Sequence, residues 1–557
     1  MNYEKLAELL FPTIDKTPED YEKIYPPRSL PEGAMVTRLA PSPTGFMHLG
    51  NLYGAFVDER LAHQTGGVFF LRIEDTDDKR YVEGAVDVII QSLDFYGIHF
   101  DEGAGKDGDR GDYGDYTQSH RAAIYQAFAK RLVQQGDAYP CFLTEEEISG
   151  IREKQEQAKA TPGIYGKYAS CRDLTFEEIE ENLKNGKPYV LRLRSDGLPP
   201  EEQQGEGRKI LVKDAIRGML EMPANFMDVV LLKTNGIPTY HFAHVVDDHL
   251  MRTTHVVRGA EWLPSLPIHV EIFEKLGLPL PIYCHTAQLM KIDEETGKRR
   301  KLSKRKDPEL SLTYYRNEGY HPLAVREYLL TILNSNFEEW RTANPDADAD
   351  EFQFTTEKMS SSGALFDLDK LNDISKDTLL RITAHDLFDF LKKWSDEFAP
   401  EYKPYFEDRA YLERILDLGR KDRKPRKDLV YARQIMKFIS YFFDDFFEIE
   451  DTVPDEVSKE DASEILRRYL ETYDHSDDNG VWFEKIRKIA SDLGYAAKPK
   501  DYKKHPDEYK GHVGHVSTVI RVALMGRRIS PDIWEIQQIL GEDRTRARLE
   551  AFIGQNQ

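Results

Sequence analysis

The segment TRLAPSPTGFMHLGN at residues 37–51 has residue types that suit the binding of a phosphate group. Its prolines and glycines favour a turn whose backbone can approach a ligand closely. His48, Gly50 and Asn51 stand where a helix is expected to begin, and free N–H groups together with the helix dipole attract anions there. A histidine at that place can donate a hydrogen bond to a phosphate oxygen. Taken alone, the segment could also be a plain strand-to-helix turn capped by Asn51.

A second segment, GKRRKLSKRKDP at residues 297–308, concentrates positive charge. Seven of the nine residues from Lys298 to Lys306 are basic, although 76 Lys plus Arg against 98 Asp plus Glu give the whole chain a net charge of −22. Such a run is often a solvated surface or a nuclear address. It would also neutralise the charge that develops when pyrophosphate leaves a nucleoside triphosphate. No G-x-x-x-x-G-K-[ST] sequence occurs, so a P-loop is excluded.

The composition narrows the class of protein. A net charge of −22 argues against a non-specific nucleic-acid coat protein, which must replace the counterions around phosphates, although local basic tracks can still bind RNA. The three cysteines cannot build a disulfide framework, which indicates a reducing compartment. No apolar run approaches the ~20 residues of a membrane span, and the acidic N-terminal stretch is unlike a secretory signal. We therefore expect a cytoplasmic protein with no membrane partner.

The elements around residues 37–51 predict an α/β domain. Residues 35–41 and 67–75 have the apolar runs of strands, and the second run is typical of a strand buried on both faces. Helical periodicity over 52–66 and 85–97 alternates with them. This alternation of strand and helix is typical of a parallel sheet.

Further regions follow along the chain. Residues 118–224 mix helical segments with short strands, which predicts an insertion before the buried-strand pattern returns at 228–250. Residues 311–385 are mixed, and from 386 onward the sequence is almost wholly helical. Residues 1–34 are expected to form one short amphipathic helix followed by a turn-rich lead.

The two segments together resemble the class I aminoacyl-tRNA synthetases. HLGN stands where that family has its HIGH-type motif, and KLSKR stands where it has its KMSKS-type motif. Residues 514–552 resemble the last helical unit of the bacterial glutamyl-tRNA synthetases. Five stretches resemble the glutamyl-tRNA synthetase set in order: RLAPSPTG (38–45), LRIEDTD (71–77), YHFAHVVDDH (240–249), VVRGAEWL (256–263) and KLSKRKD (301–307).

The resemblance implies a multidomain fold with α/β and all-α parts. Its expected regions are an N-terminal extension (1–34), a Rossmann-like catalytic domain (35–117 and 225–310), an inserted acceptor-end-binding domain (118–224), a stem-contact region (311–385) and a helical anticodon-binding domain (386–557). The implied reaction is the ATP-dependent ligation of L-glutamate to tRNA-Glu through glutamyl-adenylate, with transfer to the 2′-hydroxyl of the terminal adenosine. Mg²⁺ is expected with the ATP, held mostly by phosphate oxygens and water.

The same resemblance gives the motif residues expected roles. The expected catalytic residues are His48 at the transferring phosphate, and Lys301 and Lys304 at the pyrophosphate side. The expected ATP site also contains Gly50, Asn51, Glu261, Trp262, Leu302 and Ser303. The expected glutamate site contains Arg38, Ala40, Ser42, Glu74, Tyr240, His244 and Arg258, with the arginines suited to carboxylates and Glu74 to the ammonium group. From the residues alone, Trp262 could equally pack in a core, and Arg38 or Glu74 could pair with a neighbouring charge.

Two departures from the family pattern concern metals. His244 stands where Asn is usual, which could alter the contact with the α-carboxylate and brings it near His249 in sequence; no metal is expected there. Some relatives hold zinc with Cys-x-Cys and a later Cys-x-His, whereas this chain has only Cys141 and Cys171 in those segments. Because a structural zinc site takes four N or S ligands, no zinc is expected.

Alternatives to the leading interpretation stay open at this point. A glutaminyl-tRNA synthetase would carry β-barrels in its anticodon region, which the helical tail disfavours. A catalytically inactive tRNA-binding paralogue would have no reason to keep the motif residues. Contacts with tRNA are expected on the insertion, 298–306, Arg527 and Arg528, and on 420–427 unless that run is only a solvated helix end. A monomer is the expected state, and discrimination between tRNA-Glu and tRNA-Gln is left open.

Overall fold

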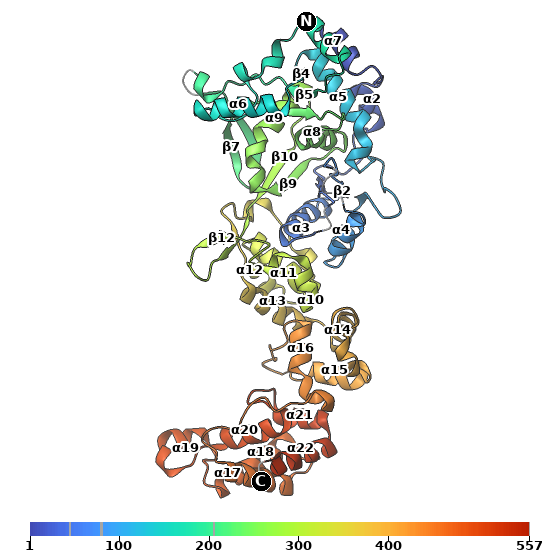
Figure 1. Cartoon of the computed structure of the whole chain (residues 1–557). Helices are drawn as coiled ribbons and strands as arrows, with labels where there is room; N and C mark the ends of the chain where they lie inside the picture. Colours follow the sequence, from blue (N-terminus) through green and yellow to red (C-terminus); the bar gives the residue numbers. More distant parts are fainter. Residues whose placement is uncertain (44–45, 78–81, 204–206, 421, 556–557) are drawn as a thin grey trace. The chain divides into compact units, whose positions relative to one another are not determined.

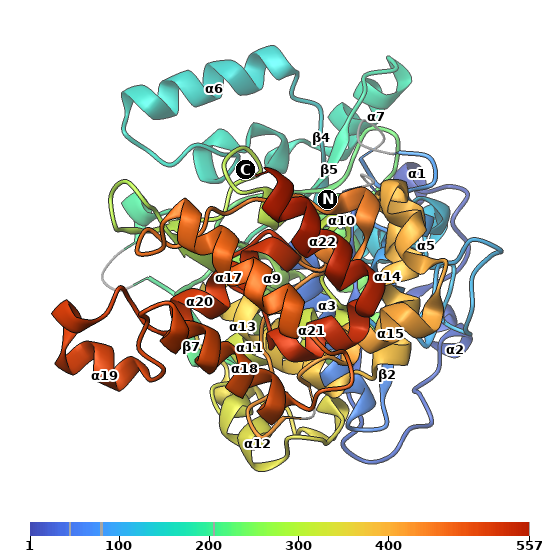
Figure 2. The ribbon, with the colours of Figure 1, turned by 90° about the horizontal axis from the view of Figure 1, so that it is seen from below.

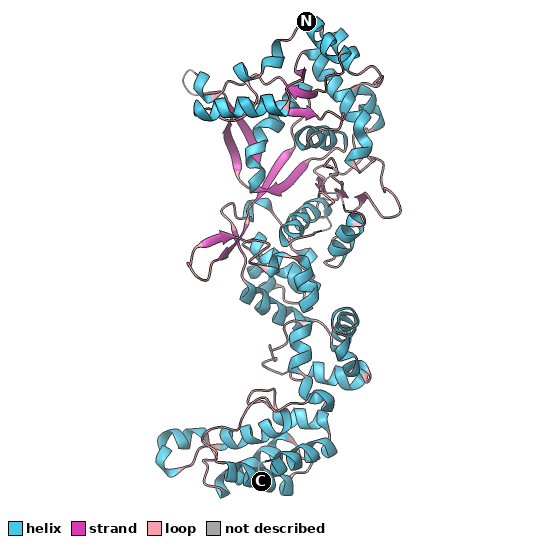
Figure 3. Ribbon diagram, in the orientation of Figure 1, coloured by secondary structure: helices cyan, strands magenta, loops and turns pink. Residues whose placement is uncertain are grey.

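Figure 1 presents a computed structural model of the chain, which describes residues 1–43, 46–77, 82–203, 207–420 and 422–555. Thr44, Gly45 and Lys421, which belong to motifs named above, lie outside these residues. The chain divides into two compact units, Met1–Leu312 with Arg326–Asp367, and Thr313–Val325 with Leu368–Gln557. Among the described residues, every strand belongs to the first unit, and the second consists of helices and loops (Figure 3).

Two sheets in the first unit meet edge to edge. A parallel sheet has the order β1-β2-β3, with β1 (Val36–Leu39), β2 (Val68–Leu71) and β3 (Glu102–Gly103). A second has the order β7-β6-β10-β9, with β6 (Lys209–Asp214), β7 (Gly218–Pro223), β9 (His255–Gly259) and β10 (Ile282–Thr286). The Thr254 N–H donates to the Val36 carbonyl at 3.0 Å, so β1 lies beside β9. The carboxyl ends of parallel strands β1, β9 and β10 therefore share one edge.

The helices of this unit cover the strands. Every residue of β1 and β2 is buried, which is the pattern of strands covered on both faces. The expected helices at 52–66 and 85–97 are confirmed as α3 and α4, with shifted ends. The helices are α1 (Tyr3–Leu10), α2 (Pro18–Ile24), α3 (Leu49–His63), α4 (Ala85–Asp94), α5 (Ala122–Gln135), α6 (Glu145–Gln157), α7 (Phe176–Lys184), α8 (Tyr240–Leu250), α9 (Leu266–Leu276) and α12 (Phe337–Ala343).

The N-terminal residues form two helices, so the expectation of a single helix over 1–34 was wrong. Helix α2 begins with Pro18 after a capping box in which Thr17 and Asp20 bond reciprocally. Both α1 and α2 pack against α5. Glu22 of α2 accepts hydrogen bonds from His249 in α8 and from Arg252 just after α8, which ties this segment to that helix.

Strand pairing crosses the expected boundary of the insertion at residue 224 in both directions. The β6–β7 hairpin, expected within the insertion, extends the sheet of β9 and β10. Conversely, β8 (Val230–Leu232) joins β4 (Ala138–Cys141) and β5 (Val190–Leu193) in an antiparallel sheet. Helix α6 buries only Gln155 and lies apart from this small sheet (Figure 2).

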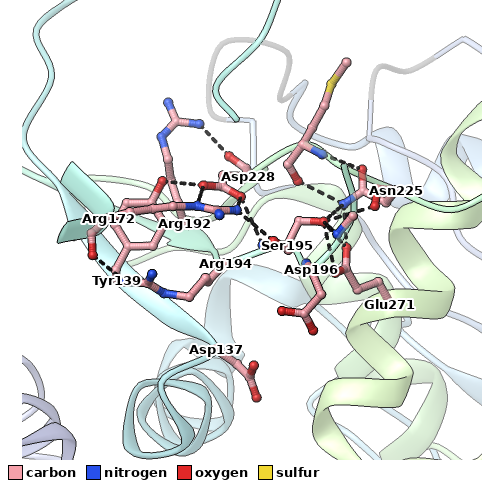
Figure 4. A network of polar contacts seen from close by, with 12 residues as sticks. Asp137, Tyr139, Arg172, Arg192, Arg194, Ser195, Asp196, Asn225, Asp228 and Glu271 are labelled. Carbon is pink, nitrogen blue, oxygen red and sulfur yellow. Dashed lines mark hydrogen bonds and ion pairs between the residues drawn. The ribbon is translucent and has the colours of Figure 1, made fainter. Parts of the chain in front are cut away.

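A polar network connects the insertion to α9 (Figure 4). Glu271 of α9 accepts hydrogen bonds from Ser195 Oγ at 2.9 Å and from Asn225 Nδ2 at 2.6 Å. Asp228 accepts from Tyr139 at 2.7 Å and also from Arg172. Because both carboxylates are buried, these bonds satisfy charges that would otherwise be costly to enclose.

The strands that follow β10 hold the basic segment. β11 (Leu289–Ile292) pairs antiparallel with β12 (Arg299–Lys301) and parallel with β13 (Ala364–Leu365). The Arg300 guanidinium donates to both carboxylate oxygens of Asp307 at 2.6 and 2.7 Å. Asp307 also accepts from the Ser303 N–H at 2.8 Å, so this carboxylate closes the KLSKR turn.

The second unit is helical around one apolar core. Helix α14 shows the reason, because Leu387, Phe388, Leu391 and Trp394 recur at helical spacing and are all buried. Helices α10 (Leu312–Glu318) and α11 (Pro322–Leu333) each contribute residues to both units. The other helices are α13 (Leu368–Arg381), α14 (Ala384–Phe398), α15 (Arg409–Asp417), α16 (Ala432–Phe438), α17 (Lys459–Thr472), α18 (Asn479–Asp492), α19 (Pro499–Lys504), α20 (Val513–Met525), α21 (Ile533–Leu540) and α22 (Glu542–Gln555). No helix among the described residues has both the length and the apolar character that a bilayer span requires.

Candidate active site

A cleft with a volume of about 740 Å³ opens where β1 and β9 end. Ligands of α/β folds bind at such a carboxyl edge, between neighbouring strands. Fourteen expected site residues line the cleft: Arg38, Ala40, Ser42, His48, Gly50, Asn51, Glu74, Tyr240, Arg258, Glu261, Trp262, Lys301, Leu302 and Lys304. Ser303 and His244 do not line it.

His48 is both the N-cap of α3 and a lining residue of the cleft. Its Nδ1 accepts a hydrogen bond from the Asn51 N–H at 3.2 Å, while Asn51 Oδ1 accepts from the His48 N–H at 3.1 Å. Since Nδ1 accepts, the neutral ring carries its proton on Nε2, where it can donate to a ligand. Burial, with help from the charge of Lys304, lowers the pKa of His48 and favours that neutral form.

Gly50 leaves space for the His48 ring. A Cβ at this position would lie 3.0 Å from Nδ1 of His48, so a larger residue would push the imidazole slightly out of its position. Opposite, the ammonium group of Lys304 lies 4.1 Å from the centre of the Phe46 ring, a cation–π contact. The lysine side chain is exposed and reaches the same cleft as His48.

Arg38 is buried and already paired. Its Nε and Nη2 donate to Asp248 at 3.0 and 3.2 Å, and Asp248 also accepts from Arg72 at 2.7 Å. Burial opposes the charge of Asp248, but the two arginines hold the pKa of that carboxyl well below its usual range. Arg38 therefore lines the cleft and also forms the ion pair that was the alternative interpretation.

Glu74 reaches the cleft from the end of β2. It accepts a hydrogen bond from Arg72 at 3.3 Å, and burial raises its pKa against the opposing charges of Arg72 and Arg38. A carboxylate enclosed in this way is stabilised by a cation that enters the cleft.

Tyr240 and Trp262 form an aromatic wall. Their ring centres are 4.6 Å apart, and Trp262 is 41% exposed. Its side chain therefore does not pack in a core, and it presents a face to the cleft. Burial raises the pKa of the neighbouring Tyr240, which keeps its hydroxyl protonated as a hydrogen-bond donor.

His244 lies behind the cleft and is fully buried. Its Nδ1 is 3.0 Å from Asp248, its Nε2 is 3.2 Å from the Tyr283 hydroxyl, and its ring centre is 4.3 Å from that of His269, with the rings tilted by 30°. Burial lowers the pKa of His244 to about 3, so the ring is neutral. Its expected contact with glutamate therefore does not fit this position. His249 instead bonds Glu22, so the two histidines do not converge.

Comparisons with known proteins agree with this geometry. A family model described as tRNA synthetases class I (E and Q), catalytic domain, matches residues 34–373, and an anticodon binding domain model matches residues 397–553. A glutamate–tRNA ligase of Acetivibrio thermocellus is 60% identical over 99% of this chain and all of its own length. The chain belongs to the glutamate–tRNA ligase family of class I aminoacyl-tRNA synthetases.

Other relatives agree with that placement. A glutamate–tRNA ligase of Clostridium perfringens strain 13 is 47% identical over 99% of this chain and all of its own. The crystal structure of a glutamate–tRNA synthetase from Elizabethkingia anophelis is 27% identical, with a TM-score of 0.72, and covers 94% of this chain and all of that one. The fold class expected from the sequence is thereby confirmed for this family member.

The cysteines in the segments where some of the family bind zinc form a close pair. A hydrogen bond from Cys171 lowers the pKa of Cys141 to about 6, and the same contact raises that of Cys171. The Asp173 side chain, at the position of a possible further ligand, is 92% exposed. In the part of the chain that the structure describes, no three metal-binding side chains converge. The expectation of no zinc stays a prediction.

The expected tRNA-binding arginines of this family member divide into two kinds. Arg527 donates to the Phe438 carbonyl at 3.0 Å and Arg528 to the Thr452 carbonyl at 2.7 Å, so both serve the fold of the second unit. In the run 420–427, Arg420 likewise donates to the Leu379 carbonyl at 2.5 Å. Arg423 and Lys424 are exposed. Lys427 is also exposed and pairs with Asp377 at 2.5 Å.

Several residues that support the site were not predicted. Asp248, His269 and His285 contact the cleft arginines from behind, Asp214 contacts His285, and Asp58 lines the cleft from α3. The sequence offered one signal for such supporting residues. It was the pair of acids in VVDDH, which are charged residues inside a buried helix. Such residues are seldom buried unless they are paired.

Proposed function

We propose that this chain ligates L-glutamate to tRNA-Glu in two steps at the cleft. The supporting observation is that one cleft brings together His48, Lys301 and Lys304 on one side with Arg38, Arg258 and Glu74 on the other. The first set suits a triphosphate and the second suits an amino acid with two carboxylates. Membership of the glutamate–tRNA ligase family fits both sets of residues, because its members use ATP and glutamate.

In the first step, the α-carboxylate of glutamate attacks the α-phosphorus of ATP, forming glutamyl-adenylate and releasing pyrophosphate. Such in-line displacement depends on positioning and on neutralising charge. Nε2–H of His48 donates to the transferring phosphate, and the ammonium groups of Lys301 and Lys304 stabilise the departing pyrophosphate. Trp262 and Glu261 line the nucleotide side of the cleft.

Recognition of glutamate uses complementary charge. Arg38 and Arg258 bind its carboxylates, Glu74 binds its ammonium group, and the Tyr240 hydroxyl donates a further hydrogen bond. Ala40 and Ser42, on the loop after β1, line the same end of the cleft. We assign His244 no direct contact with the substrate, because it is fully buried behind Arg38.

In the second step, the 2′-hydroxyl of the terminal adenosine attacks the glutamyl carbonyl, AMP leaves, and the hydroxyl proton is released. The insertion would hold the acceptor end, and the helical unit would hold the anticodon. Mg²⁺ would enter with the ATP on its phosphate oxygens, since the described lining residues form no cage of three ligands, and no step is assigned to it. The proposed setting is a cytoplasmic monomer.

ATP–pyrophosphate exchange tests this proposal, run with glutamate or glutamine and with or without tRNA-Glu. We expect exchange with glutamate, strongest in the presence of tRNA, and little with glutamine. Exchange with glutamine alone would identify a glutaminyl-tRNA synthetase. No exchange under any condition, together with retained tRNA binding, would identify an inactive paralogue.

A further inference from the structure

Two neutral imidazoles hold the guanidinium group of Arg258. Its Nε–H donates to Nε2 of His285 at 2.9 Å, and its Nη1 donates to Nδ1 of His269 at 3.1 Å. The guanidinium carbon lies 4.8 Å from the centre of the Tyr283 ring. Arg258 is only 9% exposed, so these three contacts fix the plane and the direction of the group.

The hydrogen bonds determine the tautomer of His285. Because its Nε2 accepts from Arg258, its proton must be on Nδ1, which donates to Asp214 at 2.7 Å. Asp214 is itself fixed by the backbone N–H groups of Ile216 and Arg217, each at 2.9 Å. Burial would raise the pKa of Asp214, but these bonds lower it, so it stays an acceptor.

His269 has the opposite tautomer for the same reason. Its Nδ1 accepts from Arg258, so its proton is on Nε2, which donates to Nδ1 of His241 at 3.0 Å. Burial, together with the charge of Arg258, holds the pKa of His269 well below its usual value. A protonated imidazole would have no lone pair to offer the guanidinium, so neutrality is required for this contact.

The result is a guanidinium with one edge left for a ligand. An arginine has five N–H groups, and the two imidazoles take two of them. Nη2 is buried and has no partner of hydrogen-bond geometry in the part of the chain that the structure describes. Arg258 lines the cleft, and a buried unsatisfied donor costs free energy until a ligand accepts from it.

We propose that His269 and His285 are positioning residues that aim Arg258 at a carboxylate of the substrate, with Asp214 and His241 setting their tautomers. This inference rests on the proposed role of Arg258 in binding glutamate. An ion pair with a protein carboxylate would satisfy the guanidinium before the substrate arrived. Neutral acceptors orient the group and leave its positive charge for the substrate.

Matched substitutions test the inference, because amides can replace one ring nitrogen at a time. His269→Asn keeps an acceptor near the Nδ1 position, whereas His269→Leu removes it; His285→Gln and His285→Leu are the corresponding pair for Nε2. We expect each Leu variant to raise KM for glutamate roughly 10-fold or more, the size of a lost charge-assisted hydrogen bond, with KM for ATP changed less than about 2-fold. Each amide variant should recover most of the loss.

Controls separate this inference from the function on which it rests. His321→Leu replaces a histidine of the second unit whose pKa is lowered to about 4 by burial, and it should leave KM for glutamate unchanged. Equal KM values for the Asn and Leu variants at 269, and for the Gln and Leu variants at 285, would overturn the positioning role. If Arg258→Ala itself leaves KM for glutamate unchanged, the assignment of Arg258 is wrong. If the unmodified chain shows no glutamate-dependent exchange, the proposed function fails. Circular dichroism of each variant excludes misfolding, and either pair decides the question if the other does not fold.

Discussion

Replacing His244 by the Asn usual in the family should change how the stability of the site depends on pH. In the folded chain the pKa of His244 is lowered from 6.5 to about 3 by burial, so the ring stays neutral at both pH 7 and pH 5. Once α8 opens, the ring can take up a proton below pH 6.5. A depressed folded pKa therefore contributes stability above the unfolded pKa, and this stability is lost progressively as the pH falls from 6.5 toward the folded value of about 3.

The magnitude follows from these two pKa values. Between pH 7 and pH 5, proton uptake by the opened state should lower the free energy of opening by about 2 kcal/mol, and the folded ring takes up almost nothing to offset it. His244→Asn removes this contribution and leaves the other histidines in place. The opening constant of the unmodified chain should therefore rise roughly 25-fold more than that of the variant over this range.

Hydrogen–deuterium exchange of the peptide Tyr240–Leu250 measures this opening locally and does not require the whole chain to unfold in one step. Both proteins are compared at each pH, so the intrinsic change of exchange rate with pH cancels. His321→Asn, in the second unit, is the matched control and should follow the unmodified chain. The reasoning would be refuted if the free energy of opening changed with pH by the same amount, within about 0.5 kcal/mol, in His244→Asn and in the unmodified chain.

Three further predictions concern the nucleotide side of the cleft. Lys304→Ala should lower kcat roughly 10²-fold in pyrophosphate exchange, because one donor to the departing group is lost; an unchanged rate would remove this lysine from the mechanism. Trp262→Ala should raise KM for ATP several-fold while shifting Tm by less than about 3 °C, since the side chain is 41% exposed; a large loss of Tm would restore the core-packing interpretation. Asp307→Ala removes the acceptor shared by Arg300 and the Ser303 N–H, so kcat should fall roughly 10-fold with KM for glutamate unchanged, as measured by steady-state exchange. A rise in KM for glutamate alone would contradict the last prediction.

Part of the lining of the cleft was predictable from the sequence because those residues belong to short contiguous motifs that resemble the family's motifs. A motif such as HLGN or KLSKR places its residues by local geometry, with the cap of α3 and the turn closed by Asp307. Once the parallel sheet is expected, the carboxyl edge follows from its topology. Half of the lining residues of the cleft, 14 of 28, were thus named without coordinates.

The residues that support the cleft from behind were not predictable in the same way. Asp214 and His285 lie 71 positions apart, and only the pairing of β6 with β10 brings them together. The boundary of the insertion depends on the same pairing, which propensity does not specify. The second N-terminal helix was overlooked, although Thr17, Pro18 and Asp20 gave a capping signal at its start.

The two arginines of the glutamate side differ in how their charge is balanced, and we infer that they contribute differently to substrate binding. Arg38 is paired with Asp248 before any substrate arrives, and that carboxylate is shared with Arg72. A buried pair of this kind fixes geometry strongly, because removing either partner strands a charge. In the described residues Arg258 has neutral imidazoles instead of a carboxylate partner. A substrate carboxylate therefore gains mainly orientation from Arg38 and mainly uncompensated positive charge from Arg258. Replacing His269 or His285 by an acid would introduce a protein counter-charge and weaken the attraction of Arg258 for a substrate carboxylate.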